Sequence, residues 1–453
     1  MAGEWRATSL GNLCDDGVVE LQTGPFGTQL HAHDYVTDGI PVVPTEAIRN
    51  RQIDHLVLPK ISYTKAAELS RHRLEIDDIL FARRGVQATG HIGVVRNAEE
   101  GFVCGTGAIR LRVIDKAGGV CPEFLSHVLA NPASVSWFKF HAIGATMPNL
   151  NEGIIRSFPF SIPPLPEQRA IAHILGTLDD KIELNRRRNQ TLEAMARTLF
   201  NDWFVEFGPV RTKMEGHEPY LPTDLWQLFP EQLDDEGKPE GWEMQPLSEL
   251  LTIIGGGTPK TSVEEYWTGD IPWFSVVDTP SASDVFVVAT EKSITAQGLA
   301  GSSARLIPKG TTIISARGTV GNLAIAGREM TFNQSCYGLR GTAGTGDYFV
   351  YHTAQQMVDQ LKSMAHGSVF STITRQTFEA IQRPVPPPSV LTAFEELVRG
   401  WFDAILSNVE ESRILAQLRD TLLPKLISGK LRVNETEKIM DNTILESGEA
   451  NHA

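Results

Sequence analysis

The sequence lacks the features that would direct a chain to a membrane or to an oxidising compartment. No apolar run approaches the roughly 18 residues of a membrane span, and the opening stretch MAGEWRATSL has no apolar core of a signal peptide. The four cysteines stand alone along the chain without a CxxC pair, so neither a zinc ribbon nor a disulfide framework is indicated. We therefore expect a cytoplasmic chain with reduced thiols and no membrane contact.

The common catalytic and cofactor-binding signatures are also missing. There is no GxxxxGK[ST] phosphate loop, no HExxH motif, no GxSxG elbow and no NPPY-type or DPPY-type tetrapeptide for amino-methylation. GGGTPK at 255–260 lacks the third glycine of a dinucleotide-binding loop, and the HAHD stretch at 31–34 has no further ligand cluster to complete a metal site. The sequence therefore predicts a chain that is not an enzyme and that binds neither a metal nor a cofactor itself.

An excess of basic charge is missing too, since the net charge is −14, which at first sight disfavours nucleic acid as a partner. The acidic residues are unevenly placed, however. Residues 208–245 carry 3 basic and 9 acidic side chains, and residues 434–453 carry 1 and 5, so these two segments supply −10 of the total. The two remaining regions are nearly neutral, with 14 basic and 16 acidic residues in 1–150 and 10 and 11 in 246–383.

Two long helices are predicted at matching positions. Residues 166–207 contain no internal proline and place apolar residues at alternating steps of four and three, which is the spacing of a coiled-coil seam. A shift of 223 residues gives a second stretch with the same spacing, and the entries IPP (162–164) and VPP (385–387) match as well. Since one such helix cannot bury its own stripe, we expect the two to pair. The expected seam residues are Leu178, Ile182, Asn185, Leu192, Leu199, Trp203, Ile405, Asn408, Leu415 and Leu422.

The segments that precede the two helices repeat as well. The strand-like runs DDILFA (77–82) and GAIRLRV (107–113) match GTTIISA (310–316) and CYGLRG (336–341), and the predicted helix at 122–131 matches the one at 348–361. HLVL (55–58) is a further strand candidate. We predict an α/β (α+β) fold in which two duplicated mixed-sheet domains are joined by two long antiparallel coiled-coil-like helices with pseudo-two-fold symmetry. The alternative is a single helical bundle with accidental spacing.

The predicted boundaries follow from these repeats and from composition. The connector between the halves is acidic and contains proline, but Trp226, Phe229 and Trp242 within it would seek a surface on which to pack. The polar, acidic C-terminal segment is expected to be disordered. The segments are a first globular domain at 1–165, a first long helix at 166–207, the connector at 208–243, a second globular domain at 244–388, a second long helix at 389–432 and a tail at 433–453.

Polar, glycine-rich loops after equivalent strands are the candidate binding sites. FARRG (81–85) matches SARGT (315–319), and an arginine beside a flexible glycine suits contact with phosphate or guanine. GPFGTQ (24–29) matches GGGTPK (255–260) loosely, and a third pair of polar segments precedes the long helices. Each loop also has a plainer interpretation, as a solvated arginine in a turn, a tight turn or a polar junction. The candidate DNA contacts are Thr28, Gln29, Arg83, Arg84, Lys139, His141, Asn149, Asn151, Thr258, Lys260, Arg317, Thr319, Ser368, Thr372 and Arg375.

Several stretches together resemble the DNA-specificity subunits of type I restriction–modification systems, over essentially residues 5–432. PLPEQRAIAHIL (164–175), with the helix that follows, is close to the helical region of that family. GGTPKT (256–261) with YWTGDIPWFS (266–275) is a frequent opening of its second recognition domain, and LLPKLISGKL (422–431) is a frequent close. The second helix entry, PSVLTAFEELV, departs from the pattern because it lacks the PEQ of the first.

The resemblance implies a non-catalytic subunit in which each target-recognition domain reads one half of an asymmetric, bipartite site on double-stranded DNA. The helices would hold the halves at a fixed spacing and dock two copies of a methyltransferase subunit that uses S-adenosylmethionine. A restriction and translocase subunit, which uses ATP and Mg, would join for restriction. This chain itself would bind no cofactor.

Two other classes of function stay open from the residues alone. One is a DNA methyltransferase or nuclease with degenerate motifs, which binding of labelled S-adenosylmethionine to the isolated chain would reveal. The other is a two-lobed protein–protein scaffold without a DNA role, which a gel shift with random duplex, with and without the methyltransferase partner, would separate from a DNA reader.

Overall fold

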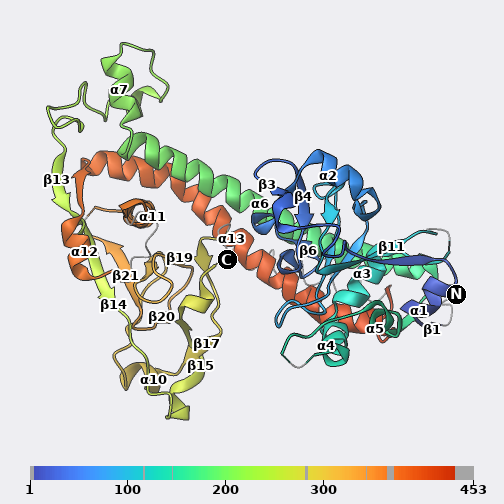
Figure 1. Cartoon of the computed structure of the whole chain (residues 1–453). Helices are drawn as coiled ribbons and strands as arrows, with labels where there is room; N and C mark the ends of the chain where they lie inside the picture. Colours follow the sequence, from blue (N-terminus) through green and yellow to red (C-terminus); the bar gives the residue numbers. More distant parts are fainter. Residues whose placement is uncertain are drawn as a thin grey trace. The chain divides into compact units, whose positions relative to one another are not determined.

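The computed structural model describes residues 5–115, 118–144, 146–280, 284–342, 344–364 and 372–433. The chain divides into two compact units, which are described separately (Figure 1). The first is formed by Met1–Asp180 with Leu415–Ala453, and the second by Lys181–Ile414. Within the described residues, no helix combines the length and the apolar character that crossing a membrane would require.

The first unit is built on two four-stranded sheets. One has the order β2-β11-β8-β9, with every neighbouring pair antiparallel, and the other has the order β10-β4-β7-β3. Strand β8, with the sequence ILFA, is buried along its whole length, as expected for a short apolar run in a sheet covered on both faces. The strands are β1 (Arg6–Ser9), β2 (Val19–Thr23), β3 (Tyr35–Val36), β4 (Ile40–Val43), β5 (Ile48–Arg49), β6 (Gln52–Ile53), β7 (Lys60–Ile61), β8 (Ile79–Ala82), β9 (Ile92–Val94), β10 (Val103–Cys104), β11 (Ala108–Val113) and β12 (Pro159–Ile162).

Short helices complete this unit. HLVL does not form the expected strand, because Asp54 caps a 3-10 turn at His55–Val57 by accepting from Leu56 N. The helix expected at 122–131 is present as α3, whose first turn is opened by Pro122. The helices before the first long helix are α1 (Leu10–Asp15), α2 (Tyr63–Glu68), α3 (Pro122–Ala130), α4 (Pro132–His141) and α5 (Glu152–Arg156).

The second unit repeats the larger sheet of the first and extends it. Its five-stranded sheet has the order β14-β21-β18-β19-β16, and a three-stranded sheet has the order β17-β15-β20. Helix α11 contacts β18, β19 and β21 of the larger sheet (Figure 1). The strands are β13 (Glu243–Pro246), β14 (Leu251–Gly255), β15 (Trp267–Phe274), β16 (Phe286–Val287), β17 (Lys292–Ile294), β18 (Thr312–Ser315), β19 (Leu323–Ala326), β20 (Thr331–Phe332), β21 (Cys336–Gly341) and β22 (Gln382–Val385), and the helices are α7 (Gly208–Met214), α8 (Thr223–Trp226), α9 (Leu247–Leu250), α10 (Ala296–Ala300), α11 (Asp347–Met364) and α12 (Arg375–Ala380).

Each sheet domain is closed by a pair of strands from its two ends. In the first unit β1 pairs antiparallel with β12, so Arg6 lies opposite Ile162. In the second unit β13 pairs antiparallel with β22, so Glu243 lies opposite Val385. The chain therefore enters and leaves each domain at one place, immediately before a long helix. The mixed α+β class with a duplicated sheet domain is confirmed.

The long helices are α6 (Leu165–Phe204) and α13 (Pro388–Ile427), each of 40 residues. Within the second unit, Asn185 donates to Glu411 Oε2 at 2.7 Å and Asn408 donates to Asn189 Oδ1 at 2.9 Å. Moving along α6 from Asn185 to Asn189, the partner on α13 changes from Glu411 back to Asn408. The two helices therefore run antiparallel. Within the first unit, Asp179 of α6 likewise accepts from Arg419 of α13 at 2.8 Å.

The predicted seam residues differ in how deeply they are buried. Leu178, Asn185, Trp203, Ile405, Leu415 and Leu422 are buried, whereas Ile182, Leu192, Leu199 and Asn408 are half-buried. The connector packs against the C-terminal half of α6, where Phe229 and Trp242 join Trp203 in one aromatic core. Phe229 and Trp242 are therefore structural, although the connector carries a net negative charge.

Candidate nucleic-acid interface

In the first unit, two of the predicted loops meet at one edge of the larger sheet. Strands β2 and β8 both run antiparallel to β11, so both end beside the beginning of β11. Gly24 N donates to Ala108 O at 3.0 Å after β2, and Arg83 N donates to Gly107 O at 2.9 Å after β8. The loops at 24–30 and 83–90 therefore leave the sheet from the same edge.

The polar segment before the first long helix joins this edge. Leu150 N donates to Arg83 O at 2.7 Å, and the Arg83 side chain donates from Nε to Asn149 Oδ1 at 3.0 Å. Residues Ile143 and Asn149 exchange backbone hydrogen bonds and close a small loop against the same place. Arg84 also bridges to Asn149, so Arg83, Arg84 and Asn149 belong to one cluster.

Helix α4 adds a cation, Lys139, to this cluster. Lys139 is exposed, and its Nζ lies 3.4 Å from His91 Nε2. Burial, and then the neighbouring Lys139 ammonium, lower the pKa of His91. The imidazole therefore stays neutral at pH 7 and can accept from the ammonium, which leaves the positive charge of Lys139 at the surface.

Other predicted residues at this edge have local structural roles. Asn151 caps α5 by accepting from Ile154 N at 2.8 Å, and Gln29 Oε1 accepts from Phe26 N at 3.1 Å. His141 stacks on Trp137 with ring centroids 3.9 Å apart. Thr28 is exposed at the tip of its loop. These contacts hold the loops in shape.

The second unit presents the same sheet edge. Strands β14 and β18 flank β21, with Gly255 opposite Tyr337 and Ser315 opposite Cys336. Ile373 N donates to Ala316 O at 2.9 Å, so the segment before α12 also reaches this edge. The third loop pair therefore occupies matching places in the two units, although Ser368 lies outside the described residues.

Sheet register shows that Arg84 and Arg317 are equivalent. The last residues of β8 and β18 are Ala82 and Ser315, and Arg84 and Arg317 each stand two residues further on. Arg84 bridges to Asn149 and Arg317 to Thr372 in the same antiparallel sense. Matching the sequences by their shared Ala-Arg is thus one residue out of register, because it places Arg83 opposite Arg317.

A glycine directly follows each of these arginines. Gly85 and Gly318 have φ of 113° and 78°, a conformation that favours glycine. The chain turns there, and both Arg84 and Arg317 are exposed. The turn explains why each guanidinium stands out from the edge of its sheet.

Some of the remaining predicted residues of the second unit are held by hydrogen bonds, and others are exposed. Arg375 donates from Nη2 to Ile253 O at 3.2 Å, which ties α12 to β14. Thr258 Oγ1 hydrogen-bonds Gln334 Oε1, whereas Lys260 and Thr319 are exposed. Among these residues, Lys260 and Arg317 offer the most accessible positive charge.

Acidic residues are scarce in particular stretches of the two sheet domains. Charge counts taken over a whole domain do not reveal this. Residues 79–98 and 124–151 contain no Asp or Glu, although the chain as a whole is strongly acidic. Residues 292–346 contain six basic residues and one acidic residue, Glu329. These stretches include the loops that carry Arg84 and Arg317 and the segment that carries Asn149. A search for acid-free runs would have found this signal in the sequence.

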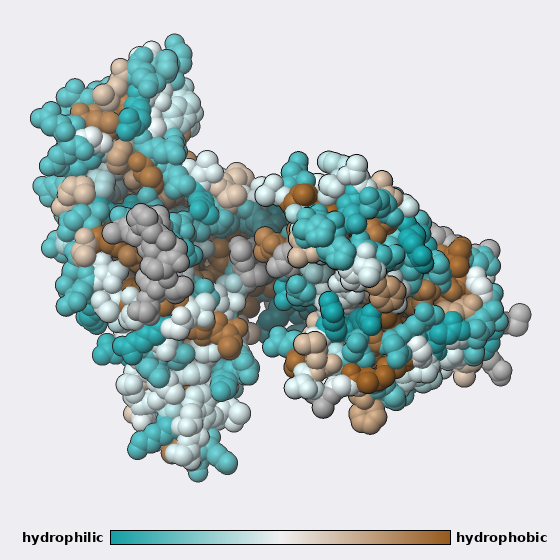
Figure 2. Space-filling view, in the orientation of Figure 1, coloured by the Kyte–Doolittle hydropathy of each residue, from teal (hydrophilic) through white to brown (hydrophobic). Residues whose placement is uncertain are grey.

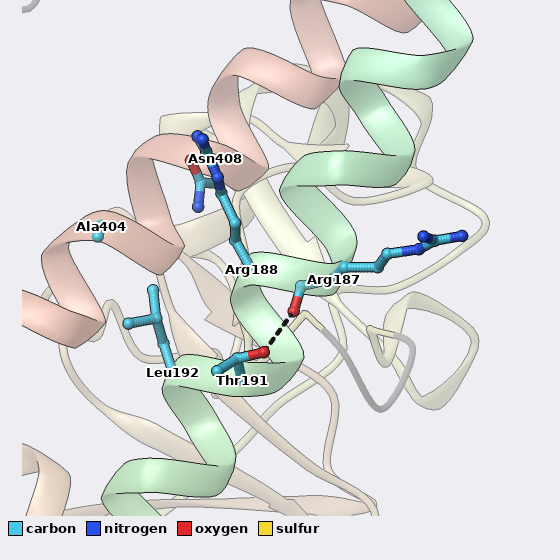
Figure 3. A pocket seen from close by; sticks show the side chains of 6 residues that line it. All are labelled: Arg187, Arg188, Thr191, Leu192, Ala404 and Asn408. Carbon is cyan, nitrogen blue, oxygen red and sulfur yellow. Dashed lines mark hydrogen bonds between the residues drawn. The ribbon is translucent and has the colours of Figure 1, made fainter.

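A separate hollow lies on the helix pair within the second unit (Figure 3). It has a volume of about 480 Å³ and is lined by Arg187, Arg188, Thr191, Leu192, Ala404 and Asn408. Figure 3 shows Leu192 on α6 and Ala404 on α13 on opposite sides of this hollow. Leu192 and Ala404 give the hollow an apolar floor, and Arg187 and the exposed Arg188 give it a cationic rim.

The described residues contain no group of three His, Cys, Asp or Glu side chains that could hold a metal ion. The geometry is that of polar and cationic loops on a duplicated scaffold.

Comparisons with known proteins agree with this organisation. Residues 16–194 and 239–391 match the family model described as type I restriction modification DNA specificity domain. The chain is 30% identical over 359 residues to the type I restriction enzyme HindI specificity subunit of Haemophilus influenzae, covering 69% of this chain and 78% of that protein. It is 25% identical over 368 residues to the type I restriction enzyme MjaIX specificity subunit of Methanocaldococcus jannaschii, covering 76% of each.

A solved structure has the same fold. The S subunit of a type I restriction–modification system from M. genitalium superposes with a TM-score of 0.55 at 15% identity, covering 94% of this chain and 96% of that chain. The family match spans both sheet domains and the beginnings of both long helices. The chain therefore belongs to the type I restriction–modification DNA specificity family.

Proposed function

We propose that this chain is the non-catalytic subunit that selects the DNA sequence for a type I restriction–modification complex. Each sheet domain reads one half of a bipartite, asymmetric site on double-stranded DNA. The observation that carries this proposal is the repeated sheet edge, on which Arg84 and Arg317 occupy equivalent, exposed positions. The surrounding loops differ in sequence between the two edges, as two readers of different half-sites require.

Arginine is the residue type that suits this role. Its planar guanidinium can donate two parallel hydrogen bonds to O6 and N7 of guanine, or bind a phosphate. Asn, Thr and Lys side chains beside it can contact base edges or the backbone. The scarcity of Asp and Glu in the stretches around Arg84 and Arg317 leaves few carboxylates that would repel the phosphates.

Replacing either arginine is expected to weaken DNA binding through its own domain. Arg317→Ala should cost about 1–3 kcal/mol if the side chain reads a base, and Arg84→Ala should do the same in the first domain. If the contact is bidentate, Arg317→Lys should recover little of the loss, because lysine keeps the charge but not the planar fork. Binding isotherms of the assembled complex on its mapped site provide the measurement.

Arg328→Ala is the matched control for these variants. Arg328 is also exposed, but it follows β19 at the other end of the sheet from Arg317. Its loss should leave binding unchanged. If the isotherms of Arg84→Ala and Arg317→Ala were unchanged as well, both residues would be solvated arginines in turns that do not contact DNA.

The helix pair is proposed to dock two copies of the methyltransferase subunit. S-adenosylmethionine would then be bound by that subunit, and ATP and Mg by a restriction and translocase subunit. The hollow between Leu192 and Ala404 supports this role, because its apolar floor and the arginines at its rim fit an amphipathic helix with acidic flanks. The chain alone should neither methylate nor cut DNA.

Filling the hollow tests the docking proposal. Ala404→Trp adds a large side chain at an exposed helical position, so the chain should fold normally. We expect the number of methyltransferase subunits per chain to fall from two to one, as measured by native mass spectrometry. Gln417→Trp, at another exposed position of α13, is the control and should keep both copies. Full occupancy in Ala404→Trp would place the docking surface elsewhere.

A further inference from the structure

Four large apolar side chains surround the arginine cluster of the first unit and are exposed to solvent. The exposed fractions are 71% for Val86, 85% for Phe140, 61% for Ile143 and 65% for Met147. These four residues are called the apolar rim. Figure 2, in which apolar residues are brown, shows brown patches among polar residues on the visible face of this unit. Single exposed apolar residues are ordinary, whereas several around one polar cluster indicate a binding surface.

Backbone contacts place the segments of the apolar rim side by side. Thr89 Oγ1 donates to Pro148 O at 3.0 Å, which ties the loop of Val86 to that of Met147. Ile143 N donates to Asn149 O at 3.0 Å, and Arg84 bridges to the same Asn149. The apolar side chains and the cations therefore share one surface.

Phe140 is held so that it projects outward from this surface. Its neighbour Phe138 is fully buried and packs against Phe81 and Phe158, with ring centroids 5.3 and 4.7 Å away. Two residues along a helix correspond to a rotation of about 200°, so Phe140 lies on the face opposite this anchor. His141, which is stacked on Trp137, meets the Phe140 ring edge to face at 5.2 Å.

The charges around Phe140 identify the class of partner. No carboxylate occurs in residues 79–98 or 124–151, while Arg84 and Lys139 are exposed beside the apolar rim. A surface that combines exposed apolar side chains with cations is complementary to duplex DNA, which has stacked apolar bases between two rows of phosphates. Phe, Ile and Met are also among the side chains that proteins insert between base pairs.

We propose that Phe140 inserts between two adjacent base pairs of the half-site read by the first domain, with Ile143 and Met147 against the exposed base faces. This inference rests on the proposed function and specifies how that domain engages its DNA. Insertion unstacks one step, so it favours a pyrimidine–purine step, which unstacks most easily. The domain would thus select sequence at a position where it makes no hydrogen bond to a base.

Unstacking would also assist the reaction proposed for the complex. A methyltransferase must rotate its target adenine out of the duplex, which costs stacking energy. A neighbouring step already opened by Phe140 lowers that cost.

The test uses the assembled complex with its methyltransferase subunits and a duplex that carries the site found by methylation mapping. 2-Aminopurine, which pairs with thymine, replaces each adenine of the first half-site on either strand in turn, except the methylated adenine, and its fluorescence reports unstacking. The wild-type complex should raise the fluorescence at one step only. Phe140→Ala should abolish this rise and weaken binding by about tenfold, whereas Phe140→Leu should keep part of both effects.

Leu56→Ala is the control, because Leu56 is 93% exposed in the same unit but lies in the 3-10 turn after β6, outside the apolar rim. It should leave fluorescence and affinity unchanged. Tight binding by the wild-type complex without a fluorescence rise at any step, or an equal rise in Phe140→Ala, would overturn the proposal. Loss of the methyltransferase subunits from Phe140→Ala would instead make the apolar rim a protein contact and also overturn it. Failure of the wild-type complex to bind the mapped duplex would contradict the proposed function itself.

Discussion

Exchanging residues 247–381 for the matching segment of another specificity subunit should change one half of the methylated site and leave the other half unchanged. The exchanged segment lies between β13 and β22, which pair with each other and pin both ends of the domain. The graft should retain Phe286, Ile325, Phe349 and Tyr351, because these belong to the core that α6 and α13 share. Methylation mapping in cells that carry the hybrid is the measurement.

The reciprocal exchange of residues 10–158, between β1 and β12, is the matched experiment. It should change the other half of the site only. If either hybrid altered both halves, the two domains would not read DNA independently, and the assignment of one half-site to each sheet edge would fail.

Lengthening both long helices by one turn should lengthen the gap between the half-sites. Because α6 and α13 are antiparallel, four residues must be added to each, between Asp180 and Lys181 and between Ile414 and Leu415. These are the points at which the chain divides into its two units, so the contacts within each unit are kept. Four residues add about 6 Å of helix and return the seam to nearly the same face. We expect both half-sequences to persist with a gap longer by about two base pairs.

Two further variants control for simple damage. Two residues in each helix would rotate the following seam by about 200° and should abolish assembly. Four residues added to α6 alone would shift its seam by one turn relative to the seam of α13 and should also abolish assembly. An active variant with four residues in both helices and an unaltered gap would show that the helices do not set the spacing.

The sequence was most informative where a pattern depends on neighbouring residues. The three-and-four spacing around Asn185 predicted the long helices, since a helix brings those residues to one face through local geometry alone. Buried runs such as Ile79–Ala82 and Thr312–Ser315 were recognisable as strands because both faces of each strand are covered. HLVL was misjudged because one carboxylate, Asp54, caps a turn that its composition does not reveal.

The candidate interface depended on contacts between distant residues. Arg83 and Arg84 are adjacent in the sequence, but only the sheet register shows that Arg84 is the counterpart of Arg317. Asn149 and Asn151 looked alike in one polar segment, yet Asn151 is a helix cap whereas Asn149 receives a hydrogen bond from Arg83. The exposure of Phe140 could not be anticipated, because an aromatic residue beside Phe138 would normally be assigned to the core.

The small number of exposed cations at the two sheet edges has a consequence for the search along a genome. Among the described residues of the two edges, the exposed cations Arg84, Lys139, Lys260, Arg317 and Arg375 would neutralise at most about five phosphates, so the logarithm of affinity should fall with the logarithm of salt concentration with a slope no steeper than about −4.5. Such limited release of counterions gives weak attachment to arbitrary DNA. The isolated chain would therefore not be sequestered on arbitrary chromosomal DNA, and long residence would begin only after both half-sites are matched and the partner subunits add their own contacts.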